Sequence, residues 1–376
     1  MTAPTTSAKA KSTVASAARS VVRGLLRVLP ARLLALVVEE SVASLHRTGD
    51  KFLSLRVRRK SGDAPAYYPI DPIAAPATVH PAILLQGPLL TADDFTLETV
   101  RYYRKCAPKS IVIVSTWHGE SEAVLQRIRA LGADVVLSDK PSTAGRMNVN
   151  YQVASTYRGL QRAGDLDCSY VAKTRTDQRL YAVHALAGFV EMLRAFPVIW
   201  KDRPRERIVA LSRWTSKFCP LFLADMFMFG RVDDLLEYWS PGIDTMSLTA
   251  AEYNQKAGSL DDLHEYAECS PEHFLVQRYL ERIGAPTDFT LKNWWTLLAE
   301  RFLVVDAAML DLYWPKYRAN DEAPEMTLEG QRVGTVLRFL DWLRLYQLRA
   351  AGRELTDFDI PGSPQTRLPL ELSAPT

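Results

Sequence analysis

Strand-like and helix-like segments alternate between residues 82 and 174, and this alternation limits the chain to few folds. Short apolar runs predict four buried strands, at 82–86, 110–116, 134–137 and 169–174. Amphipathic segments between them predict three helices, at 92–107, 119–131 and 148–163. This order is typical of an α/β fold with a mostly parallel sheet flanked by helices. In such folds, ligands bind outside the carboxyl ends of the strands.

The rest of the chain divides by composition. Beyond residue 180 the pattern is looser, with short strands expected at 207–211 and 226–229 and helices at 232–239, 276–283 and 331–350. We expect these divisions: a disordered tail at 1–15, a basic amphipathic helical region at 16–60, a proline-rich linker at 61–78, the α/β core at 79–240, a C-terminal helical region at 241–360, and a loose tail at 361–376.

Basic residues gather at the N-terminus. Within residues 1–60, twelve Lys and Arg stand against only Glu39, Glu40 and Asp50, whereas the whole chain carries a net charge of +3. A basic amphipathic helix in this segment is typical of proteins that bind an anionic membrane surface. The alternative is a helix that packs on its own domain. Nucleic acid is not an expected partner, because Phe52 is the only aromatic residue available for base stacking there.

Several function classes lack support in the sequence. No run is apolar over the 18 or so residues that a membrane-spanning helix needs. The four cysteines are far apart and include no C-x-x-C pair, which argues against a disulfide framework and favours a reducing compartment. The chain has no G-x-G-x-x-G after its first strand, no P-loop, no G-x-S-x-G elbow and no H-E-x-x-H.

The fourth predicted strand leads directly into a charged segment, which contains Lys173, Arg175, Asp177 and Arg179. A carboxylate at the end of a central strand can hold a divalent cation, which in turn can hold a diphosphate. Arg175 or Arg179 can also bind phosphate directly through two parallel hydrogen bonds. The alternative is a salt-bridged strand end. We favour function, because the charges lie at the edge where ligands bind.

A glycine-containing loop precedes the helix at 148–163. Free N–H groups and the helix dipole at such an N-terminus attract anions, and Arg146 can reach a phosphate there. Asn148 and Gln152 are four residues apart and share a helix face. The alternative for Asn148 is simple capping of the helix.

Two further carboxylates are candidates for proton transfer. Asp225 lies within an apolar run, where a carboxylate is costly unless it is paired or hydrogen-bonded. It is therefore either the partner of a basic residue or a functional group facing a cleft. Glu272 follows Ser270 and Pro271, which predict a helix start, and it shares the inward face of Val276. Burial would raise its pKa toward that of a general base, although the helix dipole alone also explains an acidic residue there.

Six motifs, taken in order, resemble the WavE-like family of lipopolysaccharide-synthesis proteins over roughly residues 80–240. They are ILLQGP, TLETVRYYRKCAP, IVIVSTWHGE, GRMNVNYQVAST, KTRTDQR and DMFMFG. The arrangement is also similar to the GT-A nucleotide-sugar transferases, in which a glycine loop and helix precede a strand that ends in D-x-D. Here the loop runs from Gly145 to Asn148, and the strand ends in Arg175-Thr176-Asp177.

The resemblance implies roles for particular residues. Asp177 would bind the metal, Mn²⁺ or Mg²⁺, or the diphosphate, and Gln86, Gly87 and Pro88 would lie beside the nucleotide base. Arg175 replaces the first carboxylate, and an arginine can neutralise a diphosphate in place of a cation. Asp225 and Glu272 would lie on the acceptor side, which is the region 241–360 together with the end of the core.

The function that the resemblance implies is transfer of a sugar from a nucleotide sugar to a glycan or lipid-linked acceptor. The enzyme would be cytoplasmic, attached to the inner face of the cytoplasmic membrane through residues 16–60. Two alternatives remain: a sugar-phosphate transferase that uses the same charged cluster, and a non-catalytic membrane-bound scaffold with a decayed transferase fold. The sequence does not name the sugar, the nucleotide or the acceptor, nor the stereochemical course.

Overall fold

The computed structural model describes most of the chain between residues 80 and 356. The described residues are 30, 33–34, 36–38, 40–41, 58, 60–62, 80–199, 206–257, 263–316, 336–356 and 359. The chain forms two units, Met1–Arg58 and Arg59–Thr376. The predicted tails at 1–15 and 361–376, and most of the predicted segments 16–60 and 61–78, lie outside the described residues.

The second unit is built on a seven-stranded sheet within its described part. Its strands are β1 (Ala82–Gln86), β2 (Val112–Trp117), β3 (Asp134–Ser138), β4 (Tyr170–Arg175), β6 (Ile208–Leu211), β7 (Met228–Arg231) and β8 (Phe302–Val305). Their order is β3-β2-β1-β4-β7-β6-β8. Only β7 runs antiparallel to its two neighbours, and all other pairs are parallel. The predicted α/β class with a mostly parallel, helix-flanked sheet is confirmed.

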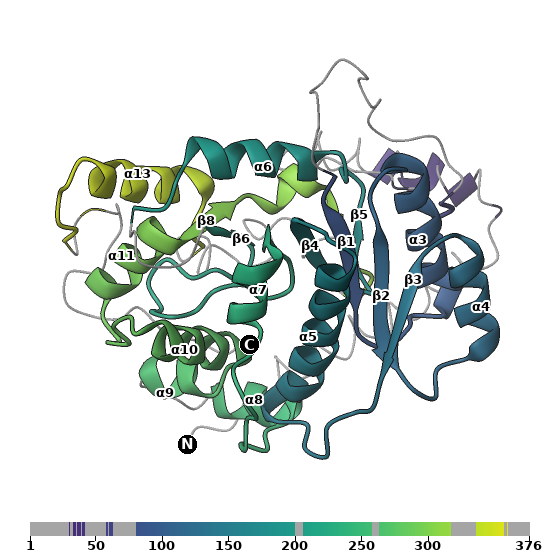
Figure 1. Ribbon diagram of the computed structural model, residues 1–376, viewed down its shortest axis with the longest axis horizontal. Helices are drawn as coiled ribbons and strands as arrows, with labels where there is room; N and C mark the ends of the chain where they lie inside the picture. The colour runs from purple at the N-terminus through teal and green to yellow at the C-terminus, as the bar shows by residue number, and fades with distance from the viewer. Residues whose placement is uncertain are drawn as a thin grey trace. The chain divides into compact units, whose positions relative to one another are not determined.

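Helices cover both faces of this sheet (Figure 1). The chain steps from β1 to β2 to β3 in one direction, so right-handed crossovers place α3 (Phe95–Cys106) and α4 (Glu122–Ala130) on the same face. It then reverses to β4 on the other side of β1, which places α5 (Val149–Asp165) on the opposite face. There α5 packs on β1, β2 and β3 and contacts α7 (Val232–Tyr238).

One close approach fixes how near α5 lies to the sheet. Gly159 faces the fully buried Leu84 of β1, and a Cβ atom at this glycine would lie 2.9 Å from the Leu84 Cδ2 and closer still to Cδ1. Packed interiors do not tolerate such distances, so any larger residue would force the helix and the strand apart. The absence of a side chain at Gly159 therefore determines the distance between α5 and β1.

The C-terminal half adds helices that the sequence predicts only in part. They are α6 (Ala185–Ala195), α8 (Ala250–Ala257), α9 (Leu263–Glu268), α10 (Pro271–Ile283), α11 (Leu291–Arg301) and α13 (Phe339–Ala350). Single 3-10 turns occur at Ala92–Asp94, Arg146–Asn148 and Ala307–Leu310, and β5 (Arg179–Leu180) pairs with β9 (Leu312–Tyr313) in a small separate sheet. Helix α10 begins with the predicted Ser270 cap, whose hydroxyl accepts the His273 N–H.

A buried arginine ties this half together. Arg207 is 1% exposed and donates hydrogen bonds to the carbonyls of Phe196 and Ala299, at 2.7 and 2.6 Å. It also donates to Pro197 and Phe302, and it lies over the Tyr346 ring. Because these carbonyls lie at or near the C-terminal ends of α6 and α11, one guanidinium satisfies acceptors that the two helices leave open.

Among the residues that the structure describes, no helix is long and apolar enough to cross a bilayer. In the first unit, residues 33–34, 36–38 and 40–41 are helical where described, and Leu33, Leu36 and Val37 expose 48%, 54% and 43% of their surface.

Candidate functional site

The order of the strands points to one edge of the sheet as the place for a ligand. Strands β1 and β4 are neighbours, yet the chain leaves β1 toward β2 on one side and reaches β4 on the other. A crevice forms at the carboxyl ends of two such strands, where α/β proteins bind ligands. Gln86 is level with Arg175 in this pair, and the Thr176 N–H donates to the Gln86 carbonyl at 3.1 Å. The Gln86–Pro88 and Arg175–Asp177 segments, both predicted, are therefore adjacent.

The Gln86–Pro88 turn presents its backbone to this edge. Gly87 has φ 114°, a conformation that a larger side chain rarely adopts, and the Thr176 hydroxyl donates to the Pro88 carbonyl at 2.5 Å. The Gln86 side chain points inward instead, with Oε1 accepting from the Ser155 hydroxyl of α5 at 2.9 Å. Gln86 is 2% exposed, so its side chain connects α5 to β1.

Arg175 and Asp177 form a closed pair at the end of β4. The Arg175 Nε lies 2.8 Å from Asp177 Oδ1, and Nη2 lies 3.1 Å from Oδ2. Trp314, which follows β9, donates its indole N–H to the same Oδ2 at 3.1 Å, and its ring lies 5.0 Å below the Arg175 guanidinium. The side chains of Arg175 and Asp177 remain 27% and 22% exposed, so the pair can meet a ligand.

This pairing bears on the predicted metal. Burial alone would raise the pKa of Asp177, but the bonds from Arg175 and Trp314 outweigh burial and lower it. Both carboxylate oxygens are thus occupied by cationic or N–H donors. Within the described part of the chain, no three His, Cys, Asp or Glu side chains gather as metal ligands. A Mn²⁺ or Mg²⁺ ion held by Asp177 together with substrate phosphates would have to displace these donors from the carboxylate.

Lys173 lies one step deeper in β4 and is fully buried. Its Nζ donates to the backbone carbonyl of Asp225 at 2.6 Å and lies 4.4 Å from the centre of the Trp239 ring. Burial lowers the pKa of Lys173 to about 7, against the opposing attraction of Asp225. The Asp225 side chain remains partly exposed, and its Oδ2 accepts from Gln152 of α5 at 2.8 Å. Asp225 therefore binds Lys173 through its backbone carbonyl and not through its carboxylate, which accepts from an amide.

Glu272 lies in the first turn of α10 and completes a group of acidic side chains. Burial raises its pKa well above the ordinary glutamate value, and repulsion from the nearby Asp225 carboxylate adds to this. Burial also raises the pKa of the Tyr238 hydroxyl, and both carboxylates raise it further. This hydroxyl has no hydrogen-bond partner among the described residues. The predicted inward orientation and raised pKa of Glu272 agree with this arrangement.

Arg146 and Asn148 lie differently from the prediction. Asp244 accepts from the Arg146 backbone N–H at 2.7 Å and from its Nε at 2.9 Å, and the side chains of Asp244 and Arg146 are 3% and 11% exposed. A carboxylate of this chain thus occupies the place predicted for a phosphate. Asn148 stands at the N-cap with φ 66°, but its side chain makes no capping bond, and it is exposed.

Arg179 does not join the charged edge either. The turn after Asp177 carries it into β5, where it is 1% exposed. Its guanidinium donates to Thr99 Oγ1 at 3.0 Å and to the Lys60 carbonyl at 2.7 Å, and it lies over the Phe95 ring. These contacts anchor α3, so the predicted role as a phosphate ligand has no geometric support.

Three residues of this region carry no local sequence signal: Asp244, Trp239 and Trp314. Asp244 is 98 residues from its partner Arg146, and Trp314 is 137 residues from its partner Asp177. An isolated aspartate in a loop, or a tryptophan beside apolar residues, is typical of ordinary loop or core structure. Only the tertiary fold identifies them.

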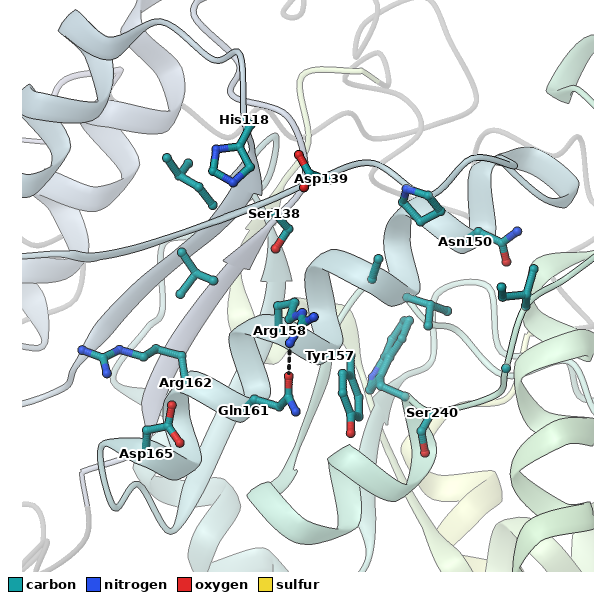
Figure 2. A pocket seen from close by; sticks show the side chains of 18 residues that line it. His118, Ser138, Asp139, Asn150, Tyr157, Arg158, Gln161, Arg162, Asp165 and Ser240 are labelled. Atoms are coloured by element: carbon teal, nitrogen blue, oxygen red, sulfur yellow. Dashed lines mark hydrogen bonds between the residues drawn. The ribbon is translucent and has the colours of Figure 1, made fainter.

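A large groove lies beside this site. It has a volume of about 920 Å³ and runs along α5, between the edge strand β3 and the segment 239–243 (Figure 2). His118, Ser138 and Asp139 mark its end at the carboxyl edge of the sheet, and Arg162 and Asp165 mark the other end. Asp177, Asp225 and Glu272 do not line it.

Comparison with known proteins identifies the family. The model of the WavE family, described as WavE lipopolysaccharide synthesis, matches residues 82–357, which include the whole sheet and the candidate site. The chain belongs to the WavE family. Membership gives it a role in lipopolysaccharide synthesis, as the motifs of β1, α5 and β4 indicated.

Other comparisons add little to the WavE assignment. The mannose-1-phosphate geranyltransferase from Thermus thermophilus resembles this WavE chain with 11% identity and a TM-score of 0.30, over 61% of this chain and 74% of that one. A TM-score this low supports no inference. A search of curated proteins found no match.

Proposed function

We propose that this WavE chain is a glycosyltransferase, which moves a sugar from a nucleotide-sugar donor to a growing lipopolysaccharide-type glycan. One observation carries the proposal: an arginine–carboxylate pair, Arg175 and Asp177, stands at the switch point of the sheet, with the carboxylates Asp225 and Glu272 nearby. Glycosyl transfer needs these two functions, one to neutralise the departing phosphate and one to take a proton from the acceptor.

Arg175 is the group for the leaving diphosphate. Its guanidinium is held flat between Trp314 and Asp177, which orients its donors before a ligand arrives. Preorganised donors stabilise developing charge at no reorganisation cost. Asp177 acts as the positioning residue for Arg175, since both of its carboxylate oxygens already accept from donors of this chain.

Glu272 is the group for the acceptor proton. Its raised pKa makes it a stronger base than an exposed glutamate, once it is deprotonated. Asp225 raises this pKa by repulsion, and Gln152 fixes the Asp225 carboxylate from α5. This role applies to a reaction that inverts the anomeric centre. A Glu272→Gln variant should then lose turnover by about a hundredfold or more, as expected when a general base is removed.

Donor binding provides the first test. Thermal stability of the full chain is measured against UDP, GDP, CMP and their sugars, with Mn²⁺ or with EDTA. A ligand at about 100 times its Kd adds about 2.7 kcal/mol. We expect a shift with one nucleotide that persists in EDTA and is lost in Arg175→Ala. Arg129→Ala, on exposed α4, is the matched control. No shift with any nucleotide would favour the scaffold, and release of a nucleoside monophosphate from a diphosphate donor would favour sugar-phosphate transfer.

We further propose that residues 16–60 hold the enzyme on the anionic inner face of the cytoplasmic membrane. The excess of basic residues and the exposed Leu33, Leu36 and Val37 support this. A triple variant, Arg19→Glu, Arg23→Glu and Arg27→Glu, should lose binding to vesicles that contain anionic lipid, and should keep donor binding. Unchanged sedimentation with such vesicles would contradict the attachment.

A further inference from the structure

The groove beside α5 has a continuous lining on one helix face. Its residues on α5 recur every three or four positions, from Asn150 through Ala154, Tyr157 and Gln161 to Asp165. At about 1.5 Å per residue this face is about 22 Å long, which suits an extended chain better than a single small molecule. Gly159 and most of the buried side chains of α5 face the sheet instead, and Tyr157, Arg158 and Gln161 on the groove face are not part of the hydrophobic core.

The fully buried Trp239 connects the groove to the surroundings of Asp225. Trp239 lines the groove, and its ring also lies 4.4 Å from the Lys173 Nζ, which holds the Asp225 carbonyl. The Trp239 Nε1 is buried and has no hydrogen-bond partner among the described residues. Gln152, one residue before the groove-lining Val153, binds the Asp225 carboxylate. A ligand in the groove therefore lies along the same helix, α5, that positions the Asp225 carboxylate through Gln152.

The lining favours a neutral, hydroxyl-rich chain. Hydroxyl, amide and guanidinium groups along it, on Ser138, Gln161 and Arg158, offer both donors and acceptors (Figure 2). Tyr157 and the aliphatic side chains between these groups offer apolar surface to the C–H faces of sugar rings. Ile243, at the rim, is 71% exposed.

Charge and shape argue against the other occupants. Arg158 and Arg162 are balanced by Asp139 and Asp165, and Arg162 is already paired with Asp134 at 2.8 Å. A groove without net positive charge does not select a polyanion. Its polar lining also makes it a poor site for an acyl chain, which would leave these groups without partners.

We propose that this groove binds the acceptor oligosaccharide and holds its reacting end at the carboxyl edge of the sheet, where Arg175 and Asp177 lie. The inference rests on the proposed glycosyl transfer and adds to it the place and the chemical class of the acceptor: a chain of several neutral sugars, held along α5 outside the donor site.

The test measures binding of a defined oligosaccharide to the full chain by calorimetry. The probe is the neutral oligosaccharide fraction, released by mild acid from lipopolysaccharide of the organism that encodes the protein and separated from charged fragments by ion exchange. We expect Tyr157→Ala and Gln161→Ala each to weaken its binding about tenfold, and Ala154→Trp, which fills the groove, to abolish it. Gln126→Ala, on exposed α4 on the opposite face of the sheet, is the matched control for Gln161→Ala and should bind as the wild type does.

Nucleotide binding, followed by thermal shift, separates this inference from the proposed function. The groove variants should keep the Kd for the donor nucleotide within twofold and, in turnover, raise the acceptor KM while kcat changes little. The inference is overturned if the oligosaccharide does not bind, if it binds all variants equally, or if the nucleotide competes with it for the groove. If the wild type binds the oligosaccharide in the groove but binds no nucleotide, the proposed transfer fails and the glycan site stands.

Discussion

Two buried cations, Lys173 and Arg207, lie in similar surroundings in the two halves of the sheet and serve different ends. Each is at most 1% exposed, each donates to backbone carbonyls, and each lies on an aromatic ring. Arg207 makes hydrogen bonds to four carbonyls near the ends of α6 and α11. Lys173, in contrast, has one acceptor among the described residues, the carbonyl of Asp225.

The difference lies in how fully the cation is satisfied. Arg207 uses its donors on fixed backbone groups, so its charge stabilises the fold around it. The charge of Lys173 is poorly compensated, which is why burial lowers its pKa to about 7, whereas the pKa of Arg207 falls only to about 10. Lys173 can therefore change its protonation near neutral pH, whereas Arg207 keeps its charge there.

The largest expected effect is on the rate of transfer, and it comes from Asp177→Asn, at the end of the strand that carries Lys173. Loss of the carboxylate frees Arg175 from its fixed orientation, and transfer should fall by about 10² to 10³, the usual cost of a misplaced charge-stabilising donor. The free energy of unfolding should change little, because the pair is partly exposed. Initial rates and urea denaturation measure both quantities, and a fully active variant would remove Asp177 from the site.

Arg207→Met should have the opposite effect: it should lower stability and leave the rate of transfer unchanged. It leaves several buried carbonyls without donors, and each such group costs about 1 to 3 kcal/mol, so unfolding should become easier by roughly 3 kcal/mol or more. The kcat of the molecules that remain folded should equal that of the wild type. A loss of kcat as large as that of Asp177→Asn would show that the two halves are not separate in function.

Lys173→Met sharpens the comparison through pH. Because the folded-state pKa of Lys173 is about 7, the unfolded chain binds a proton that the folded chain lacks between about pH 7 and the ordinary lysine range. Stability of the wild type should therefore rise with pH in that window, by about 1.4 kcal/mol per pH unit at most, and the variant should lack this rise. Urea denaturation at each pH gives the free energy of unfolding of both proteins, and the difference between them isolates Lys173. The same pH dependence in both proteins would contradict a lowered pKa of Lys173.

The smallest effect is expected from Glu272→Gln on stability. A raised folded-state pKa means that the folded chain holds its proton more tightly than the unfolded chain does. Stability should be highest below the ordinary glutamate pKa and should decline as pH rises through the folded-state pKa, opposite in sign to the Lys173 contribution. The glutamine variant should not show this decline. Denaturation midpoints across the range from the ordinary glutamate pKa upward measure it, and an identical decline in both proteins would exclude Glu272 as its source.

The sequence predicts the first half of the sheet well and the second half less well. Strands β1 to β4 fall within two residues of their expected bounds, because β-branched runs and clear helical periods alternate there. The helices α6 and α11 and the strand β8 were not predicted. Leu291–Arg301 and Phe302–Val305 follow one another without a turn, and an apolar run of this kind is equally compatible with helix or strand.

The site was predictable where chemistry follows a strand and not where it depends on distant partners. Asp177, Arg175 and the Gln86–Pro88 turn were located from the strand ends alone. Arg146 and Arg179 were expected to meet phosphate, but Asp244 and the Lys60 carbonyl bind them, and no local pattern shows these partners. An arginine near the edge of the sheet where a ligand is expected can equally well donate its hydrogen bonds to acceptors of its own chain.

Gly159 has a consequence for how such an enzyme can change over evolution. On one side, helix α5 carries Gln152, whose amide positions Asp225, and on another side it lines the groove. The distance between α5 and β1 is set by Gly159, which has only a hydrogen atom as its side chain. Mutations that alter the groove-lining residues leave that distance untouched, so new acceptors can be explored one side chain at a time. A mutation at Gly159 would move both sites at once, and we expect this position to resist change while the groove diverges.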